Sequence, residues 1–295
     1  MSLLSEPPLT RIRWAPAWRI VPTRYPTVYL FDRIADASDF DALYALEAMT
    51  NDRLRDEVGQ IELVAPADRL VGPGSGPIMA AFTHLNPLGS RFSDGHYGVC
   101  YAARERDTAI AETQYHHGKF LAATNEGPLQ LPMRLYSVRI DARLHDLRGE
   151  SPANEAFHDP DDYSAARALG RQLREGGSNG VVFRSVRRPG GQCVGLFQPR
   201  GARDCLHAAH LLYAWDGERF GDVYEKVARR SCTIARYSRA ACRARPPRAN
   251  WSNRSTGAPP ASGRGMPGPP AFEPWSSWCC RRRCRSSRSG TPTAT

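Results

Sequence analysis

The composition of the chain changes abruptly near residue 231, and this change limits how much of it can fold around a core. Residues 231–295 contain twelve arginines against one acid, Glu273, together with nine prolines, five glycines and ten serines. No helical or alternating apolar periodicity runs through them, and proline pairs interrupt any regular element. We therefore expect a disordered, Arg/Pro/Ser-rich tail over residues 231–295 and a folded body before it.

The same change locates the positive charge. The 295 residues carry a formal charge of +10, and the tail alone carries +11, so residues 1–230 carry −1. We therefore expect no direct nucleic-acid binding by the body. The run Arg281–Arg283 leaves a second interpretation open, an arginine-rich arm that contacts nucleic acid weakly. Truncation at about Arg230 distinguishes the two interpretations, because nucleic-acid binding would be lost only if the tail is such an arm.

Apolar content and cysteine usage indicate the compartment. Hydrophobic residues make up 41% of the chain, enough for a packed core, but no run of 18 apolar residues could span a membrane. No apolar segment of a secretory signal follows Met1. The body has three cysteines, Cys100, Cys193 and Cys205, without paired spacing, which argues against a disulfide framework. The sequence predicts a cytoplasmic protein.

Local patterns predict mixed secondary structure in the body. Short strands and helices without strict β–α–β alternation favour an α+β fold in a single domain. We expect a capped helix after Ser38 and a loop over 72–77. Strands are predicted at 97–103, 133–140, 211–215 and 223–227, a hairpin at 180–185 and 193–197, and a helix at 104–117. Asp161 or Asp162 should cap a further helix, which buries Ala166, Leu169, Gly170 and Leu173 and ends at Gly176-Gly177.

Several familiar catalytic signatures are missing from the sequence. It contains no glycine-rich dinucleotide or P-loop motif, no H-E-x-x-H and no G-x-S-x-G. Glu112 and His116 share a helix face, but no third ligand lies nearby in the sequence, and the cysteines at 279, 280 and 284 lack zinc-finger spacing. We predict no metal site.

One segment, residues 89–112, does combine residue types that chemistry uses. It places Arg91 in a glycine-flanked loop, Tyr101 on a strand and Glu112 on the following helix, at spacings of ten and eleven residues. Taken singly, these residues read as a turn cation, a core aromatic and a solvated acid. Taken together, Gly89-Ser-Arg-Phe-Ser93, Val99-Cys-Tyr-Ala-Ala103 and Thr108-Ala-Ile-Ala-Glu112 form an ordered set.

This set resembles the RES-domain family, the toxin half of RES–Xre type II toxin–antitoxin systems. The later stretches 180–187 and 193–197 and the pair Trp18-Arg19 extend the resemblance over roughly residues 15–228. Ser90 stands where the family has a second glycine, and residues 36–88 form a longer lead-in than short members have. The resemblance implies an N-terminal lead over 1–14 and a RES domain over 15–230 that is similar to the ADP-ribosyltransferase fold.

The resemblance also implies an activity, namely consumption of NAD+ as substrate by cleavage of its nicotinamide–ribose bond, with no resident cofactor. It assigns Glu112 to stabilising positive charge on the ribose, Arg91 to the pyrophosphate, and Tyr101 to the nicotinamide or an oxygen of the ribose or phosphate. Arg19 and Ser185 are implied as weaker substrate contacts. Such a reaction builds oxocarbenium character, which a carboxylate stabilises.

The acceptor and the partners stay open at this point. Water or phosphate as acceptor would make the chain an NAD+ glycohydrolase or phosphorylase, and a protein side chain would make it a mono-ADP-ribosyltransferase. The resemblance implies an Xre-like helix-turn-helix antitoxin that restrains growth inhibition, and it allows a homo-oligomer within that complex. A non-catalytic binding module, or a decayed toxin, is the alternative from another class.

Overall fold

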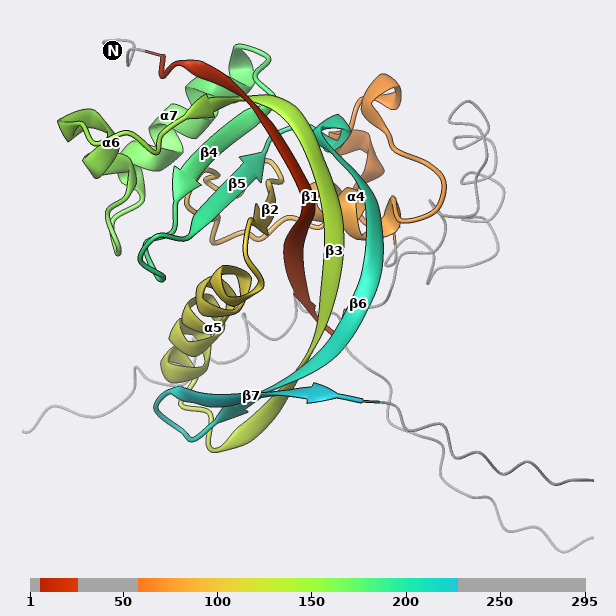
Figure 1. The fold of residues 1–295 in the computed structure, drawn as a ribbon, viewed down its shortest axis with the longest axis vertical. Coiled ribbons are helices and arrows are strands. Elements are labelled where there is room, and N and C mark those ends of the chain that lie inside the picture. Colours follow the sequence, from red (N-terminus) through yellow and green to blue (C-terminus); the bar gives the residue numbers. More distant parts are fainter. Residues whose placement is uncertain (1–5, 26–57, 228–295) are drawn as a thin grey trace, which may run out of the picture. The chain divides into compact units, whose positions relative to one another are not determined.

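The computed structural model describes residues 6–25 and 58–227. The helix predicted after Ser38 and the predicted tail lie outside the described residues. Within the described part, one mixed sheet with helices beside it confirms the α+β prediction (Figure 1).

The sheet has seven strands in the order β1-β2-β5-β4-β3-β6-β7. Because β1 also pairs with β3, the strands β1, β2, β5, β4 and β3 close into a ring, and β6 and β7 extend the sheet from β3. Only β3 and β4 run parallel. The strands are β1 Leu9–Pro22, β2 Cys100–Ala103, β3 Leu129–Asp146, β4 Gly180–Arg184, β5 Gln192–Leu196, β6 Ala202–Trp215 and β7 Phe220–Lys226.

Within residues 6–25 and 58–227, four α-helices and three short 3-10 helices connect the strands. In Figure 1, α4 lies on one side of the long curved strands, and α6 and α7 lie on the other. The helices are α4 Gly76–Thr83, α5 Arg106–Ala123, α6 Pro152–Phe157 and α7 Ser164–Glu175, with η2 Ile61–Leu63, η3 Pro66–Asp68 and η4 Pro199–Gly201.

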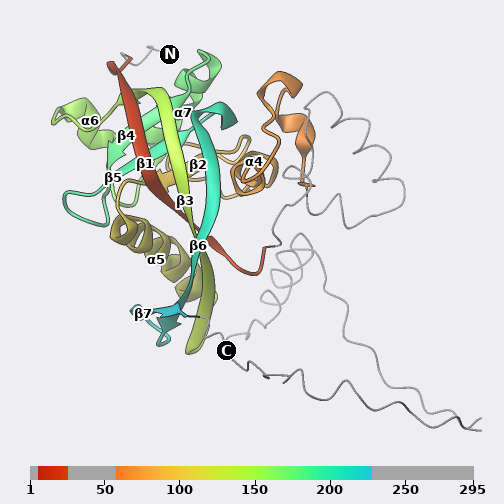
Figure 2. The same ribbon diagram turned by 45° about the vertical axis from the view of Figure 1, so that its right-hand side comes forward.

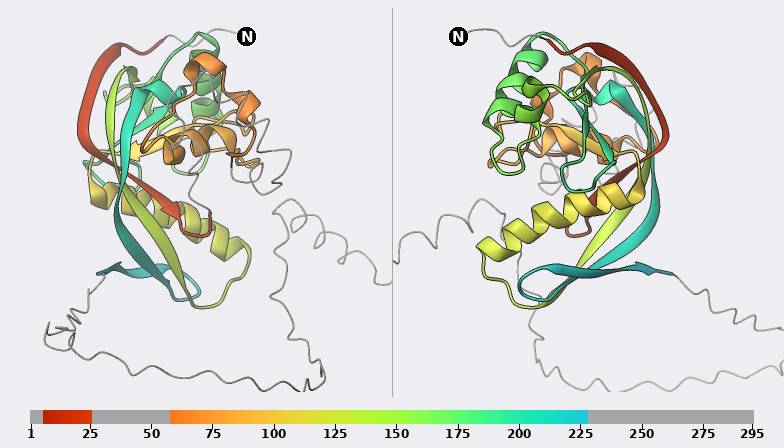
Figure 3. Two further views of the ribbon diagram at one scale, coloured as in Figure 1. Left: turned by 90° about the vertical axis from the view of Figure 1, so that its right-hand side faces the viewer. Right: turned by 60° about the vertical axis from the view of Figure 1, so that its left-hand side comes forward.

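Two apolar cores follow from this arrangement. One fills the ring, where Ile140 and Val194 meet Ile78 of α4. The other lies on the outer face of β2, β5 and β4, where Leu169 of α7 and Ala109 of α5 pack. Figures 2 and 3 show α5 crossing beside the long strands toward β7. The α5 residue Gly118 leaves room there, since a Cβ on it would lie 3.4 Å from the Trp215 ring.

The strand β1 is the largest element that the sequence patterns did not predict. It pairs with β3 over its whole length, from Leu9 opposite His145 to Pro22 opposite Met133. The register shifts between Trp14 and Ala17, where Pro16 lies. A proline inside a strand argues against a regular ladder, and here the bulge accommodates it.

Most of the later elements confirm their predictions. The hairpin β4–β5 forms where expected, and the 104–117 helix continues as α5. The pair β6–β7 also forms, but β6 begins at Ala202, well before the predicted 211, and the 133–140 strand extends to the whole of β3. The apolar face of α7 is also as predicted, with Ala166, Leu169, Gly170 and Leu173 buried.

Three boundaries differ from the predictions. The helix α4 begins at Gly76 inside the predicted loop, because a proline in the first turn has no N–H to lose there. The predicted strand 97–103 begins only at Cys100, since Tyr97 is held in the preceding loop by Ser93 Oγ, which donates to its carbonyl oxygen. Tyr163, not Asp161 or Asp162, is the N-cap residue of α7. Asp162 accepts a hydrogen bond from Ser164 N instead.

Candidate active site

Arg91 lies in the loop before β2 and is buried, with 6% of its surface exposed. Its Nη1 donates to the carbonyl oxygens of Phe157, at 3.1 Å, and Asp159, at 2.7 Å. The Tyr163 ring covers its guanidinium at 4.4 Å. No carboxylate within the described ranges forms an ion pair with Arg91, so it is a buried cation held by neutral groups.

Tyr101 holds this loop from the strand β2. Its hydroxyl accepts a hydrogen bond from Phe92 N at 3.0 Å and pairs with Ser90 Oγ at 2.9 Å. These two partners are the chain neighbours of Arg91, so the phenol fixes the backbone on both sides of the arginine. Burial raises the pKa of Tyr101 to about 12, although hydrogen bonding to Ser90 and Phe92 opposes the shift.

Glu112 faces Ser185 across the gap between α5 and the end of β4. The Ser185 hydroxyl donates to Glu112 Oε1 at 2.6 Å. Ser185 Oγ itself accepts hydrogen bonds from the backbone N–H groups of Arg187, at 3.2 Å, and Arg188, at 3.0 Å. With its lone pairs occupied by two donors, the serine has only its own hydrogen to give, and it gives it to the carboxylate. Glu112 is therefore held as a hydrogen-bond acceptor.

A histidine on the same helix lies beside this carboxylate. His116 Nε2 lies 4.0 Å from Glu112 Oε2, one turn along α5. Desolvation lowers the pKa of His116, Glu112 opposes this, and the charges of Arg187, Arg91 and Lys119 lower it further. These effects together favour the neutral form of the His116 ring.

Arg187 completes the group; it ends the stretch 180–187 of the family resemblance, where it had no assigned role. Its guanidinium stacks on the Tyr115 ring at 3.2 Å, and its Nη2 donates to Pro160 O. Its Nε is buried and has no hydrogen-bond partner among the described residues. A buried donor without a partner is costly unless a ligand or water meets it.

Arg19 lies apart from this group. Its neighbours Trp18 and Ile20 on β1 pack in the core beneath α5, whereas Arg19 is paired with Tyr136, which belongs to the core inside the ring. Since side chains alternate along a strand, Arg19 occupies the opposite sheet face from Trp18. Its Nη1 donates to the Tyr101 carbonyl oxygen at 3.1 Å. The structure thus joins Glu112 to Ser185, sets the Tyr101 hydroxyl against the two neighbours of Arg91, and gives Arg19 a backbone contact on the other face.

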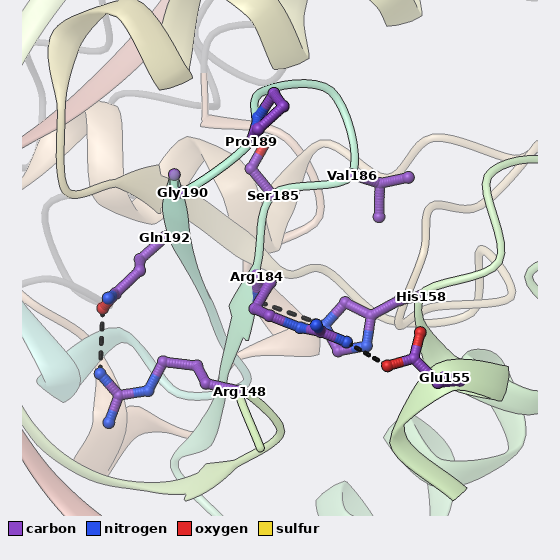
Figure 4. A pocket seen from close by; sticks show the side chains of 10 residues that line it. Arg148, Glu155, His158, Arg184, Ser185, Val186, Pro189, Gly190 and Gln192 are labelled. Atoms are coloured by element: carbon purple, nitrogen blue, oxygen red, sulfur yellow. Dashed lines mark hydrogen bonds and ion pairs between the residues drawn. The ribbon is translucent and has the colours of Figure 1, made fainter. Parts of the chain in front are cut away.

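A cavity of about 480 Å³ opens beside Ser185, between the β4–β5 turn and the 148–158 region (Figure 4). Its wall includes Arg184, whose Nη2 donates to Glu155 Oε1 at 2.5 Å, and His158, whose Nε2 accepts from Arg184 N at 3.1 Å. Arg148 donates to Gln192 Oε1 on the opposite side at 2.9 Å. The volume falls within the range of small-molecule pockets.

Within residues 6–25 and 58–227, no three His, Cys, Asp or Glu side chains gather as metal ligands would. The three cysteines of this part, Cys100, Cys193 and Cys205, are buried and form no disulfide with one another. None of the helices described is both long and apolar enough to cross a bilayer.

Comparisons with known proteins match a family model, a curated relative and a solved structure. The model of the RES domain matches residues 66–216, a span that includes Arg91, Tyr101, Glu112 and Ser185 but not Arg19. The uncharacterized protein y4oC of Sinorhizobium fredii is 30% identical over 209 residues, which cover 70% of this chain and 86% of that protein. Among solved structures, the M. tuberculosis MbcT–MbcA toxin–antitoxin complex matches with a TM-score of 0.35 and 12% identity, over 73% of this chain and 86% of that one.

Proposed function

The chain belongs to the RES domain family, and on that premise we propose that it is an enzyme that consumes NAD+ by cleaving the nicotinamide–ribose bond. The observation that carries the proposal is the contact of Glu112 with Ser185, which holds a carboxylate in a fixed orientation. A binding module has no need of a carboxylate held in this way.

The chemistry of the bond explains why a fixed carboxylate matters. When the bond from ribose C1′ to the nicotinamide nitrogen breaks, the electron pair leaves with nicotinamide and positive charge develops on the ribose. Glu112 stabilises that charge and Ser185 keeps its oxygen aimed, so little reorganisation is needed during the reaction.

The arginines suit the other end of the substrate. NAD+ carries a pyrophosphate, and guanidinium groups match phosphate oxygens through paired donors. Arg187 has a buried Nε with no partner in the described part of the chain, and Arg91 carries a charge that no described carboxylate neutralises. We assign pyrophosphate binding to Arg91 with Arg187 beside it, and we assign Tyr101 to holding the Arg91 loop.

The acceptor defines the product. Water would give ADP-ribose, phosphate would give a phosphorylated ADP-ribose, and a protein side chain would give mono-ADP-ribosylation. We propose free NAD+ degradation by water or phosphate, because all three acceptors share one cation-like transition state and small acceptors need no docked protein.

The family also supplies the biological setting of the proposal. We place the chain as the cytoplasmic toxin of a toxin–antitoxin module, restrained by an Xre-like partner that binds DNA through its own helix-turn-helix. The charge of −1 on residues 1–230 supports this division of labour, since the body has no excess of basic residues for DNA.

The test is NAD+ loss over time by the purified chain, with and without phosphate, beside the Glu112→Gln variant. We expect Glu112→Gln to retain the fold and to lose about 10²-fold in rate, the scale of a lost charge-stabilising group. Glu175→Gln at the exposed end of α7 is the matched control and should keep the wild-type rate. Equal rates for Glu112→Gln and wild type would exclude the assignment. Label transfer from NAD+ to protein without free ADP-ribose would favour the transferase.

A further inference from the structure

The N-terminal half of β1 has one strand edge without a partner in the described part of the chain. On one side β1 pairs with β3 along its length, but on the other side it meets β2 only at Trp18 opposite Ala103. The segment Leu9–Trp14 therefore presents an open edge. Open strand edges are templates on which another extended chain can pair.

The hydrogen-bonding pattern tells which backbone groups lie on that edge. Asp146 N donates to Pro8 O, so Pro8 and Asp146 form a hydrogen-bonded pair of the antiparallel ladder. Such pairs alternate along the strands, so Thr10, Ile12 and Trp14 direct their groups toward β3. The N–H and C=O of Leu9, Arg11 and Arg13 then point away from β3, to the open edge.

A hollow lies against the same edge. Its volume is about 440 Å³, and five consecutive residues, Thr10–Trp14, form one of its walls, with Arg104 and Arg148 on the other. Alternate side chains of a strand point to opposite faces, so five consecutive residues can line one hollow only where it meets the backbone edge itself.

The side chains around this edge are strongly basic. Arg11, Arg13 and Arg203 share one carboxylate, Asp141, at 2.7, 3.7 and 3.6 Å. The side chain of Arg13 is 72% exposed, and that of Arg104, with Glu105 at 3.7 Å, is 53% exposed.

Like charges also face each other within the sheet, where Arg11 is paired with Arg143 and Arg139 with Arg203. Such cross-strand pairs weaken a sheet. The stability of the fold therefore does not explain this concentration of arginines.

We propose that this edge binds an extended acidic segment of a partner protein, which adds a strand to β1 and directs alternate carboxylates to Arg11, Arg13 and Arg104. Main-chain hydrogen bonds to the three free positions supply the pairing, and the arginines supply specificity for acidic side chains. The shared Asp141 carboxylate shows that these guanidiniums already bind a carboxylate in this geometry.

Charge and shape disfavour the other occupants. A second copy of the chain would bring arginines against arginines. A nucleic-acid strand would be repelled by the Asp141 carboxylate in the middle of the patch. At the two ends of the patch it would meet the exposed apolar side chains of Leu9 and Leu206. Exposed leucines beside arginines suit a polypeptide better than a phosphate backbone.

The test uses the full chain and a synthetic probe, the blocked peptide Thr-Glu-Val-Glu-Val-Glu-Thr, followed by amide hydrogen exchange resolved by residue. We expect saturating peptide to slow exchange of the Arg11 and Arg13 amides at least tenfold. The Ile12 and Trp14 amides, already directed to β3, should not change. The same peptide with Lys in place of Glu should not bind.

Charge reversal gives an independent measurement. Arg13→Glu and Arg104→Glu should each weaken peptide binding at least tenfold, whereas Arg219→Glu, 87% exposed at the β6–β7 turn, should leave it unchanged. Failure of the peptide to bind at millimolar concentration, or binding that leaves the Arg11 and Arg13 amides unprotected, would overturn the proposal. So would tighter binding of a fifteen-residue oligothymidylate, or a dimer that forms through the edge.

Discussion

Ser185 and Glu112 come from segments 73 residues apart, and the serine hydroxyl donates to Glu112 Oε1 over 2.6 Å. The serine is itself held by the N–H groups of Arg187 and Arg188. The turn after β4 therefore fixes the orientation of the Glu112 carboxylate on α5.

Removing the Ser185 hydroxyl tests this dependence. Ser185→Ala frees the carboxylate and leaves two backbone N–H groups without their acceptor, so we expect NAD+ cleavage to slow by about 10- to 100-fold and the free energy of unfolding to fall by about 1–3 kcal/mol. Single-turnover kinetics and urea unfolding measure the two effects. Ser137→Ala, at a half-buried position on β3 where the hydroxyl makes only a long bond of 3.4 Å to Leu206 O, should change neither. A wild-type rate of NAD+ cleavage in Ser185→Ala would show that Ser185 has no role in orienting Glu112.

Tyr101→Phe tests the hold on the Arg91 loop. The variant leaves the buried Phe92 N–H without its acceptor, which should lower the free energy of unfolding by about 1–3 kcal/mol. We expect KM for NAD+ to rise more than kcat falls, because Arg91 is assigned to binding. Tyr224→Phe, whose exposed hydroxyl bonds only Asp222 on its own strand, is the control and should behave as wild type. Unchanged stability and KM in Tyr101→Phe would contradict the assignment.

Gly170→Ala tests the packing of α7 behind this loop. A Cβ on Gly170 would lie 2.3 Å from the Phe92 carbonyl oxygen, so the helix must move away. We expect a loss of about 1–3 kcal/mol of stability and lower activity, since Phe92 follows Arg91 directly. Gly176→Ala at the end of the same helix, where the nearest atom would be 3.4 Å away, should stay within about 0.5 kcal/mol of wild type. Thermal unfolding of the two variants side by side gives the answer.

His117 gives the fold a pH dependence. Desolvation, with the charge of Arg24 and the neighbouring His116, lowers the pKa of His117 to about 4. In the unfolded chain this histidine binds a proton near pH 6.5, whereas in the folded chain it does so only near pH 4. The free energy of unfolding is therefore unaffected above pH 6.5 and falls as the pH drops from 6.5 to 4. We expect a loss of about 2 kcal/mol in urea titrations. His117→Gln should flatten that slope, and an unchanged slope would exclude the residue as its source.

Elements built from local patterns were predictable, and those built from distant pairings were not. The buried face of α7 follows from helical spacing, and the β4–β5 hairpin follows from two apolar runs around Pro189-Gly190-Gly191. The strand β1 was missed because Pro16 breaks its pattern and its partner lies more than 100 residues away.

The candidate site shows the same division. The spacing of residue types in the sequence indicated Arg91, Tyr101 and Glu112. It could not show that the Tyr101 hydroxyl forms hydrogen bonds with the residues on either side of Arg91. Nor could it place Arg19 on the other face of the sheet, because face assignment requires knowledge of the strand itself. Arg187 lay in a recognised motif, yet its stacking on Tyr115 depends on tertiary structure.

The pairing of β1 with β3 has a consequence for synthesis on the ribosome. Leu9 is made 136 residues before its partner His145, so the first strand leaves the exit tunnel long before the ring can close. The turn that carries Ser185 emerges later still, and without it Glu112 lacks its hydrogen-bond donor. A nascent chain therefore stays catalytically silent until most of the body has been translated. On the proposed consumption of NAD+, this delay leaves time for a protective partner to be present first.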